Sequence, residues 1–568
     1  MGTRTGELEG RAPRRWSVLA ATLLAAFVLG AAASAANLRE ALDSITERDL
    51  DAHLRFLASD ELRGRAPGTA GGDAAAAYIA AQFARAGLEP LGPDFLQTFD
   101  VLGSTVDPGA SSLVITGPGA ASARAPLSAA YPAEAVVWPG VADSGIDVEG
   151  EIVFAGYGIA APEYGWDDFG SQDLSGKVLL VLVGDPPASP MEPDLFAGVA
   201  LTYYGRWTYK LEEAAGRGAA GVLLVHSTAR AGYPWGVVEA SWTGEQFSLP
   251  PRPDGAPVAP LQGWVTTDFA RRLLARADLD LGDLTARAAR REFSALRTGL
   301  VARGTVSASV RRLQTANVVG VLPGGEEAVR PEAVVLTAHY DHLGVGPAVD
   351  GDSIYNGAYD NASGVSALLE VAEAFGSLDP RPRRSVVLIA TAAEEAGLLG
   401  AEHYVRHPLV PLGRTLAIVN VDGANLWGET NDVVAMGADR STLGLVVRER
   451  AREMGMRLAP DRAPDRGFFF RSDHFPFARA GVPALYLEHG LSYRGRPAGW
   501  GERRLARYDE RDYHQPSDEY EPGIDLSGAV QQARLVFLVG YDVAQGDAFP
   551  EWFESSEFKP ARDRMMGR

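Results

Sequence analysis

The sequence predicts an α/β fold, in which helices sandwich a mainly parallel or mixed β-sheet and a smaller β-rich domain is inserted. From about residue 300 onwards, apolar runs of strand length alternate with segments of helical period. Between residues 131 and 292 the pattern changes to short apolar runs separated by Gly, Pro and Asp. The chain has 568 residues, more than one hydrophobic core normally holds, so we expect more than one domain.

The N-terminus has the order of regions of an export signal. A basic stretch, RAPRRW, precedes the apolar run SVLAATLLAAFVLG, and the small residues ASA at 33–35 offer a cleavage site. We predict a signal peptide over residues 1–35 and an exported mature protein, periplasmic or secreted, that contacts no membrane. The alternative is an uncleaved anchor, because residues 17–36 would just span a bilayer about 30 Å thick. Arg14 and Arg15 leave Sec and twin-arginine export both open.

Residues 36–130 are expected to form the first part of the main domain. The stretches LDAHLRFLASDEL and GGDAAAAYIAAQFARAGL place apolar residues three and four apart, which predicts helices. GRAPGTAGG lies between them and has the composition of a loop.

The expected insert, residues 131–292, contains three short apolar runs that we interpret as strands: GEIVFAGYGI, KVLLVLVGDPP and AAGVLLVHS. A helix is predicted at RWTYKLEEAAGRG, between the second and third. The stretch GRGAAG at 216–221 matches the dinucleotide-binding pattern, but it follows a helix and precedes a strand. Nucleotide binding requires the reverse order, so we reject that function.

Residues 293–568 are expected to form the main part of the larger domain. ANVVGVLPG, AVVLTAHY, SVVLIATA and LAIVNVDG are continuous apolar runs, typical of strands that are covered on both faces. GVSALLEVAEAFGSL, STLGLVVRERAREMG and LSGAVQQARLVFLVGYDVA have helical period. Ligands of such sheets bind at the carboxyl ends of the strands.

The composition excludes several function classes. The net charge of −20 argues against a nucleic-acid partner, which requires a basic face. The absence of cysteine excludes disulfides, thiolate metal sites and cysteine nucleophiles, so a metal would need His, Asp and Glu as ligands. The chain has neither the G-x-S-x-G pattern of serine hydrolases nor the H-E-x-x-H pattern of zincins.

Acidic and imidazole side chains gather where the predicted strands end. They are His339, Asp341, His342, Asp360, Glu394, Glu395, Asp422 and, in a loop before the last helix, His514. Each alone has an ordinary explanation as a turn residue, a helix cap or a satisfied polar group. Together they would repel one another, because the same motifs supply no Lys or Arg. Metal binding is the economical interpretation.

The segments AHYDHLG, YDNASG, AAEEAGLLG, VNVDG and DYHQPSDE, in this order, resemble those of the co-catalytic zinc aminopeptidases of peptidase family M28. FLASDELRGRAPGTAGGDAAAAYIAAQF is similar to the N-terminal region of bacterial members, and residues 131–292 are similar to their protease-associated (PA) domain. The resemblance covers nearly the whole mature chain. It implies a zinc exopeptidase fold of the phosphorylase/hydrolase-like kind.

The resemblance also implies the roles of the site residues. It assigns two divalent metal ions, expected to be Zn²⁺, to the ligands His339, Asp360, Glu395, Asp422 and His514, with Asp360 bridging. Glu394 would be the general base, and Asp341 would orient the imidazole of His339. Tyr513 would donate a hydrogen bond to the tetrahedral oxyanion.

The segment FFFRSDHFPFARAGVPAL resembles a substrate-pocket segment of the family. Arg471 and Asp473 are the residues expected to bind substrate there. Phe468–Phe470 would form either the pocket wall or the core.

The remaining histidines are expected to have no direct role as ligands. His342, His474 and His489 are predicted to be structural or to support the ligands. His403 and His407 lie four residues apart on a predicted helix, a spacing that suits a metal, but no carboxylate motif flanks them.

The predicted function is an aminopeptidase whose partner is a peptide substrate with a free N-terminus. A carboxypeptidase or amidohydrolase on the same di-metal site is the nearest alternative, and a single-zinc glutaminyl cyclase is a third. A non-catalytic, receptor-like binding protein would need lost ligands or a lost base. The preferred N-terminal residue and the oligomeric state stay open.

Overall fold

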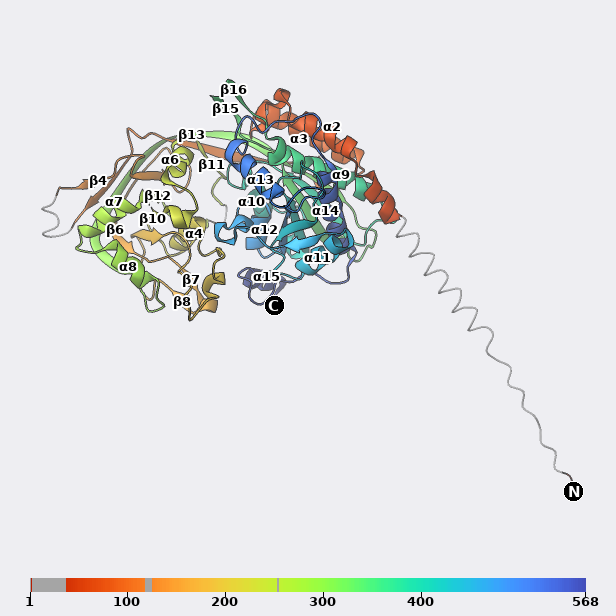
Figure 1. The fold of residues 1–568 in the computed structure, drawn as a ribbon. Coiled ribbons are helices and arrows are strands. Elements are labelled where there is room, and N and C mark those ends of the chain that lie inside the picture. The colour runs from red at the N-terminus through yellow and green to blue at the C-terminus, as the bar shows by residue number, and fades with distance from the viewer. Residues whose placement is uncertain (1, 3–36, 118–124, 253–254) are drawn as a thin grey trace.

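The computed structural model describes residues 2, 37–117, 125–252 and 255–568. The predicted signal peptide therefore lies outside the described residues, apart from Gly2. Within the described part of the chain, no helix combines the length and the apolar character needed to cross a membrane. Figure 1 shows two lobes, which we call the main lobe and the inserted lobe.

The main lobe is built on a mixed sheet. Its centre consists of adjacent parallel strands, in the order β17 (Ser385–Thr391), β14 (Ala333–His339), β18 (Thr415–Val421) and β21 (Ala484–His489). Antiparallel strands extend the β17 side: β13 (Leu296–Leu322), β1 (Glu89–Pro90), β2 (Leu96–Val106) and β11 (Gln246–Ser248). The other side ends with β19 (Asp432–Met436) and β20 (Arg457–Ala459).

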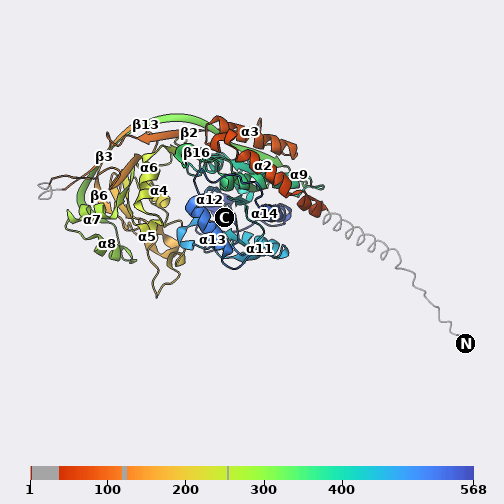
Figure 2. The same ribbon diagram turned by 45° about the horizontal axis from the view of Figure 1, so that its top comes forward.

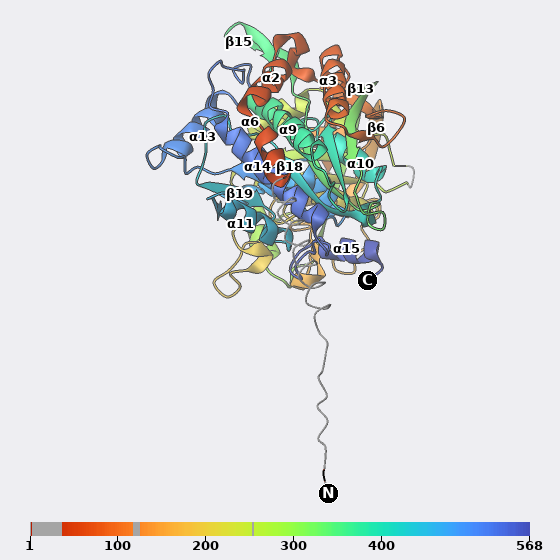
Figure 3. The same cartoon turned by 90° about the vertical axis from the view of Figure 1, so that its right-hand side faces the viewer.

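Helices cover both faces of this sheet, as Figure 3 shows from the end of the main lobe. One face packs against α2 (Glu47–Leu57), α3 (Ala70–Arg85), α9 (Gly364–Gly376) and α14 (Ser527–Gln545), and α11 (Leu443–Glu453) packs on α14. The other face packs against α10 (Leu399–Arg406) and α12 (His474–Arg479). All residues of β14 and β17 are buried, as their continuous apolar runs predicted. The predicted class, a mixed α/β sheet between helices, is confirmed.

A glycine sets the distance between α14 and the sheet. A Cβ at Gly540 would lie 3.2 Å from Leu336 on β14 and 3.3 Å from Phe375 on α9. Few real contacts are that tight, so glycine lets the helix approach the strand closely.

The inserted lobe is built on a second sheet with the strand order β4–β3–β13–β6–β9–β10–β12–β5. The bounds are β3 (Ser112–Thr116), β4 (Leu127–Ser128), β5 (Ala135–Pro139), β6 (Gly145–Phe154), β9 (Val178–Leu182), β10 (Gly221–His226) and β12 (Leu261–Thr266). Its helices are α4 (Trp207–Gly216), α5 (Thr228–Ala231), α6 (Trp235–Thr243), α7 (Thr267–Ala275) and α8 (Leu281–Ala288), and β7 (Ala160–Ala161) pairs with β8 (Trp166–Asp167).

This second sheet extends beyond the predicted insert of residues 131–292 at both ends. β3 and β4 precede that range, and the first part of β13 follows it. Local composition does not show which distant strand a segment pairs with, and the domain bounds stay a prediction. The assignment of the lobe as a PA domain stays a prediction.

One strand belongs to both sheets. β13 pairs with β3 and β6 through Ser307, and from Ala308 onwards it pairs with β2 and then with β17. In Figures 1 and 2 it arches along the top of the molecule from one lobe to the other. The two sheets therefore share one continuous strand, which is hydrogen-bonded to neighbouring strands in each lobe.

The remaining elements are short or peripheral. They are a helix over residues 37–44, the hairpin β15 (Gly344–Val349) and β16 (Asp352–Tyr355), α13 (Trp500–Arg511) and α15 (Lys559–Met566). Short helical turns occupy Asp60–Arg65, Pro162–Tyr164, Leu195–Ala197, Ala358–Ser363, Leu412–Arg414, Pro464–Arg466 and Phe468–Phe470.

Candidate metal centre

Three neighbouring parallel strands deliver polar side chains to one edge of the main sheet. His339 is the last residue of β14, and in the strand register it lies opposite Thr391, the last residue of β17. Glu394 and Glu395 follow β17, and Asp422 follows β18. Because parallel strands end on the same side, these side chains meet.

Two further side chains reach this edge from connecting segments. Asp360 lies in the turn that leads into α9, where the backbone N–H groups of Tyr359 and Asp360 donate to the carboxylate of Asp518 at 2.9 and 3.1 Å. His514 lies in the loop after α13, and its ring stacks on that of Tyr513 with the centroids 3.9 Å apart.

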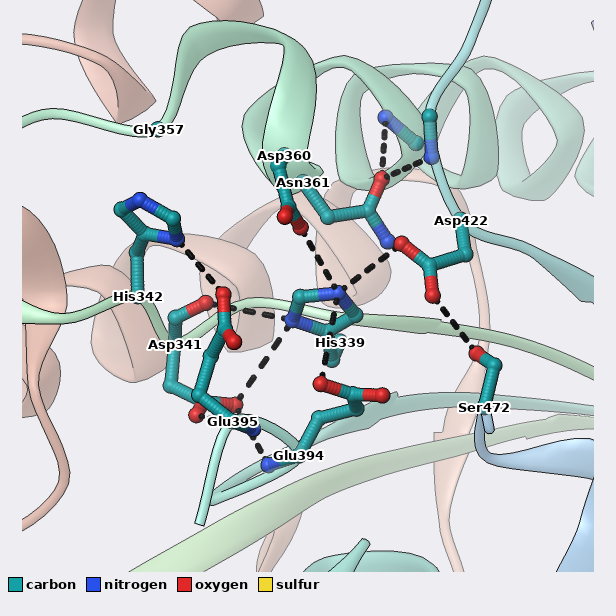
Figure 4. A network of polar contacts seen from close by, with 12 residues as sticks. His339, Asp341, His342, Gly357, Asp360, Asn361, Glu394, Glu395, Asp422 and Ser472 are labelled. Atoms are coloured by element: carbon teal, nitrogen blue, oxygen red, sulfur yellow. Dashed lines mark hydrogen bonds and ion pairs between the residues drawn. The ribbon is translucent and has the colours of Figure 1, made fainter. Parts of the chain in front are cut away.

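The carboxylate of Asp360 stands between two pairs of side chains. Its Oδ1 lies 3.3 Å from Nε2 of His339, which is 3.1 Å from Oδ1 of Asp422. Its Oδ2 lies 3.3 Å from Nε2 of His514, which is 3.1 Å from Oε2 of Glu395. The structure thus brings all five predicted ligands together. Figure 4 shows His339 at the centre, with Asp360, Asp422 and Glu394 around it.

The chemistry of these donors fits a divalent cation. Ligand atoms of His339, Asp360 and Glu395 lie within 4.8 Å of one another, as do those of His339, Glu394 and Asp422. Among the described residues, no Lys or Arg forms an ion pair with any of these carboxylates. Imidazole and carboxylate groups are ordinary ligands of zinc and of harder divalent metals.

The pKa shifts reflect the excess of negative charge. Burial alone would lower the pKa of His339, but Asp422 and Glu394 beside it raise this pKa well above its usual value. Burial would also raise the pKa of Asp360, but the imidazoles of His339 and His514 hold it well below the usual range. The carboxylates thus favour positive charge at this place, as a cation site requires.

The adjacent glutamates face different partners. Oε1 of Glu395 lies 2.7 Å from Nδ1 of His342, and its other oxygen faces His514. Glu394 lines the cavity above the site, with Oε2 4.0 Å from Nε2 of His339. Burial raises the pKa of Glu394 well above its usual value. The two carboxylates thus face different surroundings, one between two imidazoles and the other at the cavity.

Asp341 supports this arrangement through the backbone. Its two carboxylate oxygens accept hydrogen bonds from the N–H groups of Glu394 and Glu395, at 3.1 and 3.4 Å. Its predicted partner, Nδ1 of His339, lies 3.9 Å from the carboxylate and 3.2 Å from the main-chain oxygen of Asp341. The side chain therefore orients the glutamate pair more directly than the imidazole.

A cavity of about 1960 Å³ lies between the lobes and opens onto the site. Trp138, Trp207 and Trp242 of the inserted lobe line it, opposite Asp360, Glu394, Glu395, Asp422 and His514. Tyr513 and Arg471 also line it, and the side chain of Tyr513 is 49% exposed.

Asp473 does not reach this cavity. It is fully buried, it accepts a hydrogen bond from Thr391 Oγ1, and burial raises its pKa to about 7. The prediction that it binds substrate is corrected on this point, because the side chain turns beneath the sheet edge. Of the three neighbouring phenylalanines, Phe468 and Phe470 line the cavity and Phe469 lies in the core.

The other histidines lie apart from the cavity lining. His403 stacks on Phe99 with the centroids 4.5 Å apart, and His407 lies beside it at 4.9 Å. His474 lies between Phe469 and Tyr486. His489 bonds the hydroxyl of Tyr359 at 2.9 Å.

Several supporting residues were not predicted. Buried Arg65 donates to the main-chain oxygens of Tyr340 at 2.7 Å and Asn356 at 2.6 Å, which ties down the segments behind His339 and Asp360. Its loop sequence gave no signal for this role. Ser472 donates to Asp422 Oδ2 at 2.7 Å. Ser472 and Asp518 both lie inside the sequence segments that contain predicted site residues. Their polar side chains in those segments were the signal that could have suggested them.

The structure thus places a cluster of candidate metal ligands at the carboxyl ends of parallel strands in a mixed α/β fold. Residues 317–539 match the model of peptidase family M28. This part of the chain is therefore similar to the M28 peptidases.

Similar proteins carry peptidase names. Aminopeptidase YwaD of Bacillus subtilis is 27% identical over 250 residues, 44% of this chain and 49% of that protein. Leupeptin-inactivating enzyme 1 of Streptomyces exfoliatus is 28% identical over 244 residues, 41% of this chain and 51% of that protein. The probable glutamate carboxypeptidase AMP1 of Arabidopsis thaliana is 28% identical over 210 residues, 34% of this chain and 27% of that protein. The chain spans about half or less of the length of these relatives.

Among solved structures, an aminopeptidase from Aneurinibacillus sp. strain AM-1 overlays with a TM-score of 0.48 at 18% identity. The overlay covers 90% of this chain and 97% of that one.

Proposed function

We propose that the protein is an exported, metal-dependent exopeptidase that removes the N-terminal residue of peptides. The observation that carries this proposal is the carboxylate of Asp360, which lies between a His339–Asp422 pair and a His514–Glu395 pair. The M28 match and the relatives named aminopeptidases support it. Export rests on the signal-like sequence of residues 1–35.

Two divalent ions, zinc by the family resemblance, would be held by the five residues that the site brings together. His339 and Asp422 would hold one ion, Glu395 and His514 the other, and Asp360 would bridge them. When bound, such ions acidify a water molecule and polarise the scissile carbonyl.

The proton transfers fall to Glu394. Its carboxyl group faces the cavity, and its raised pKa suits a group that accepts a proton and returns it. Glu394 would take the proton of the attacking water and deliver it to the leaving amine. Asp341 would keep Glu394 and Glu395 in place through their backbone N–H groups.

Tyr513 is the proposed donor to the oxyanion. Its ring stacks on that of His514 and its side chain lines the cavity, so the hydroxyl stands within the substrate space. One such hydrogen bond is worth about 3 kcal/mol of transition-state stabilisation in comparable sites.

The inserted lobe is proposed to be a PA domain that roofs the cavity. Its tryptophans line the same cavity as the metal centre, so we expect the lobe to hinder the approach of a folded protein to Glu394. Short peptides need no such displacement. We therefore expect activity on small peptides and none on folded proteins.

The test combines metal content with activity on one purified sample. Metal per chain is quantified, and aminoacyl anilides, N-blocked peptides and C-terminally free dipeptides are assayed before and after chelation. About two metals per chain, with chelator-sensitive release only from free N-termini, is the expected result. Cleavage of blocked peptides would instead favour a carboxypeptidase or amidohydrolase, the reading that the AMP1 match supports. A sample with neither metal nor turnover would contradict the proposal and leave a non-catalytic binding role.

A further inference from the structure

Two arginines from different lobes line the cavity, and neither has an acidic partner among the described residues. Arg206, the residue before α4, belongs to the inserted lobe, and Arg471 lies in the main lobe beside Ser472. Both line the cavity and the small recess next to it, together with Tyr233. Nε of Arg206 is buried and has no hydrogen-bond partner within the described chain.

Three other arginines of the cavity lining have acidic partners. Arg406 pairs with Glu402 at 2.9 Å. Arg462 pairs with Glu488, and Arg479 pairs with both Glu212 and Glu402.

Neither Arg206 nor Arg471 forms an ion pair with a carboxylate in the ranges that the structure covers. Asp465 lines the same small recess, yet no ion pair joins it to either arginine. Arg466 also lines the cavity and the recess without an ion pair among the described residues, and its charge acts on Arg471. Arg206 differs from it in having a buried Nε that lacks a hydrogen-bond partner there.

The two guanidinium groups act on each other. Burial and the charge of Arg471 together lower the pKa of Arg206 to about 10. Two cations brought together at a wall of low polarity are stabilised by an anion placed between them. Because arginine donors match the geometry of a carboxylate, a bound carboxylate would satisfy the orphan Nε as well.

The pair lies within reach of a peptide bound at the metal centre. Ser472, next to Arg471 in the chain, donates to the ligand Asp422 at 2.7 Å. The charge of Arg471 also interacts with Tyr513, whose ring stacks on the ligand His514. Because Arg471 is linked to two residues of the metal centre in this way, we expect an extended peptide, which advances roughly 3.5 Å per residue, to reach both places.

We infer that Arg206 and Arg471 form an anion subsite that binds a carboxylate of the substrate. The inference rests on the proposed exopeptidase function and names its preferred substrates. The arginines repel the ammonium group of a free N-terminus, so the carboxylate belongs to a residue further along the peptide. It is either the C-terminal carboxylate of a di- or tripeptide or an acidic side chain.

The test compares matched substrates that differ only in this charge. Leu-Ala and its amide Leu-Ala-NH₂ are assayed on the metal-loaded, full-length enzyme, with leucine p-nitroanilide as a substrate that lacks a carboxylate. We expect kcat/KM for the free acid to exceed that for the amide by roughly tenfold to a hundredfold, the effect of one charged hydrogen-bonded pair. The pair Leu-Asp-NH₂ and Leu-Asn-NH₂ tests whether a side-chain carboxylate serves equally.

Variants assign the preference to the two arginines. R206Q, R471Q and the double variant should each reduce the acid-to-amide ratio, and the double variant should bring it close to one. R471K should keep part of the preference, because it retains the charge but loses the planar fork. R303Q, which removes an exposed arginine paired with Asp147 on the far sheet, should leave the ratio unchanged. Thermal unfolding of each variant checks that the fold is intact.

The outcomes separate this inference from the proposed function. Chelator-sensitive hydrolysis of the anilide with an acid-to-amide ratio near one, or a ratio that the double variant leaves unchanged, would overturn the subsite alone. Absence of any metal-dependent turnover would overturn the proposed function. In that case, equilibrium binding of Leu-Ala and Leu-Ala-NH₂ to the metal-loaded protein measures the same preference, and equal affinities would overturn the subsite too.

Discussion

The two lobes each contain a buried cluster of charged groups, and the clusters differ in their charge balance. In the inserted lobe, Lys210 is fully buried and interacts with Asp168 and Asp185, while its Nζ donates to the main-chain oxygen of Gly184 at 3.2 Å. Asp168 accepts from the indole of Trp166 at 2.9 Å. Burial lowers the pKa of Lys210 to about 7 and raises that of Asp168 to about 7. This cluster supplies both signs of charge.

The cluster in the main lobe supplies mainly one sign. Asp360, Glu394, Glu395 and Asp422 converge there with imidazoles as their only ion-pair partners among the described residues. Arg65, which lies behind them, donates its hydrogen bonds to main-chain oxygens and not to these carboxylates. Burial alone therefore does not mark a functional site. A functional metal site is indicated instead by buried carboxylates whose negative charge a bound cation would neutralise.

The largest expected effect is the loss of the bridge in the main lobe. Asp360→Ala removes the carboxylate that faces both His339 and His514, so we expect metal content to fall and peptide hydrolysis to drop below detection. Metal analysis and a leucine anilide assay on the same sample measure both. Asp439→Ala, an exposed aspartate before α11, is the control and should change neither. Normal metal content in Asp360→Ala would remove the distinction between the clusters.

The second prediction separates the adjacent glutamates. Glu394→Gln should keep the metal and reduce kcat by about 10²–10⁴-fold, because the amide cannot accept the proton. Glu395→Gln should lose metal as well as activity, because its carboxylate faces His514. Equal metal loss in both variants would mean that the two side chains do not have separate roles.

The third prediction concerns the self-balanced cluster. Lys210→Met leaves Asp168 and Asp185 buried without their cation, which should lower the free energy of unfolding by ~3 kcal/mol. Lys177→Met in the same lobe breaks a partly exposed pair with Glu151, so its effect should stay below ~1 kcal/mol. Denaturant unfolding measures both. If Lys210→Met lowered the free energy of unfolding no more than Lys177→Met, the buried charges around Lys210 would not stabilise the fold as an ion network.

A pH experiment examines a buried imidazole that stays neutral. Burial lowers the pKa of His489 from 6.5 to about 4. Between these pH values the unfolded chain binds a proton that the folded chain does not, so stability falls as the pH falls through this window. His489→Gln should reduce the slope of unfolding free energy against pH by up to about 1.4 kcal/mol per pH unit. An unchanged slope would show that His489 is protonated in the folded protein.

The smallest effect is expected for the histidine pair at the end of α10. His403→Ala and His407→Ala should leave metal content and kcat/KM unchanged, because neither side chain lines the cavity. His403→Ala should cost ~1 kcal/mol of stability through the lost stacking on Phe99. A fall in bound metal in either variant would reveal a second site that the charge-balance argument misses.

The sequence predicted the parts of the molecule that follow from local pattern. The buried strands β14, β17 and β18 have continuous apolar runs, so the side chains after His339, Thr391 and Val421 were expected at one sheet edge. What it could not predict depends on long-range pairing and side-chain direction. Asp473 and Arg471 lie two residues apart, yet one turns into the core and the other into the cavity. The roles of Arg65 and Asp341 depend on backbone groups, which side-chain patterns do not reveal.

Strand β13 gives the architecture an unexpected modularity. β2 and β13 leave the main lobe as antiparallel neighbours, with Val106 opposite Ala308, and nearly the whole inserted lobe lies between those two residues in the sequence. In topological terms this lobe is an insertion at the turn of a β-hairpin. Replacing residues 107–307 by a two-residue Asn-Gly turn would close the hairpin and remove only β11 from the main sheet. The lobe that contains Arg206 is therefore attached to the main lobe at a single hairpin, and its removal would leave the main sheet otherwise complete.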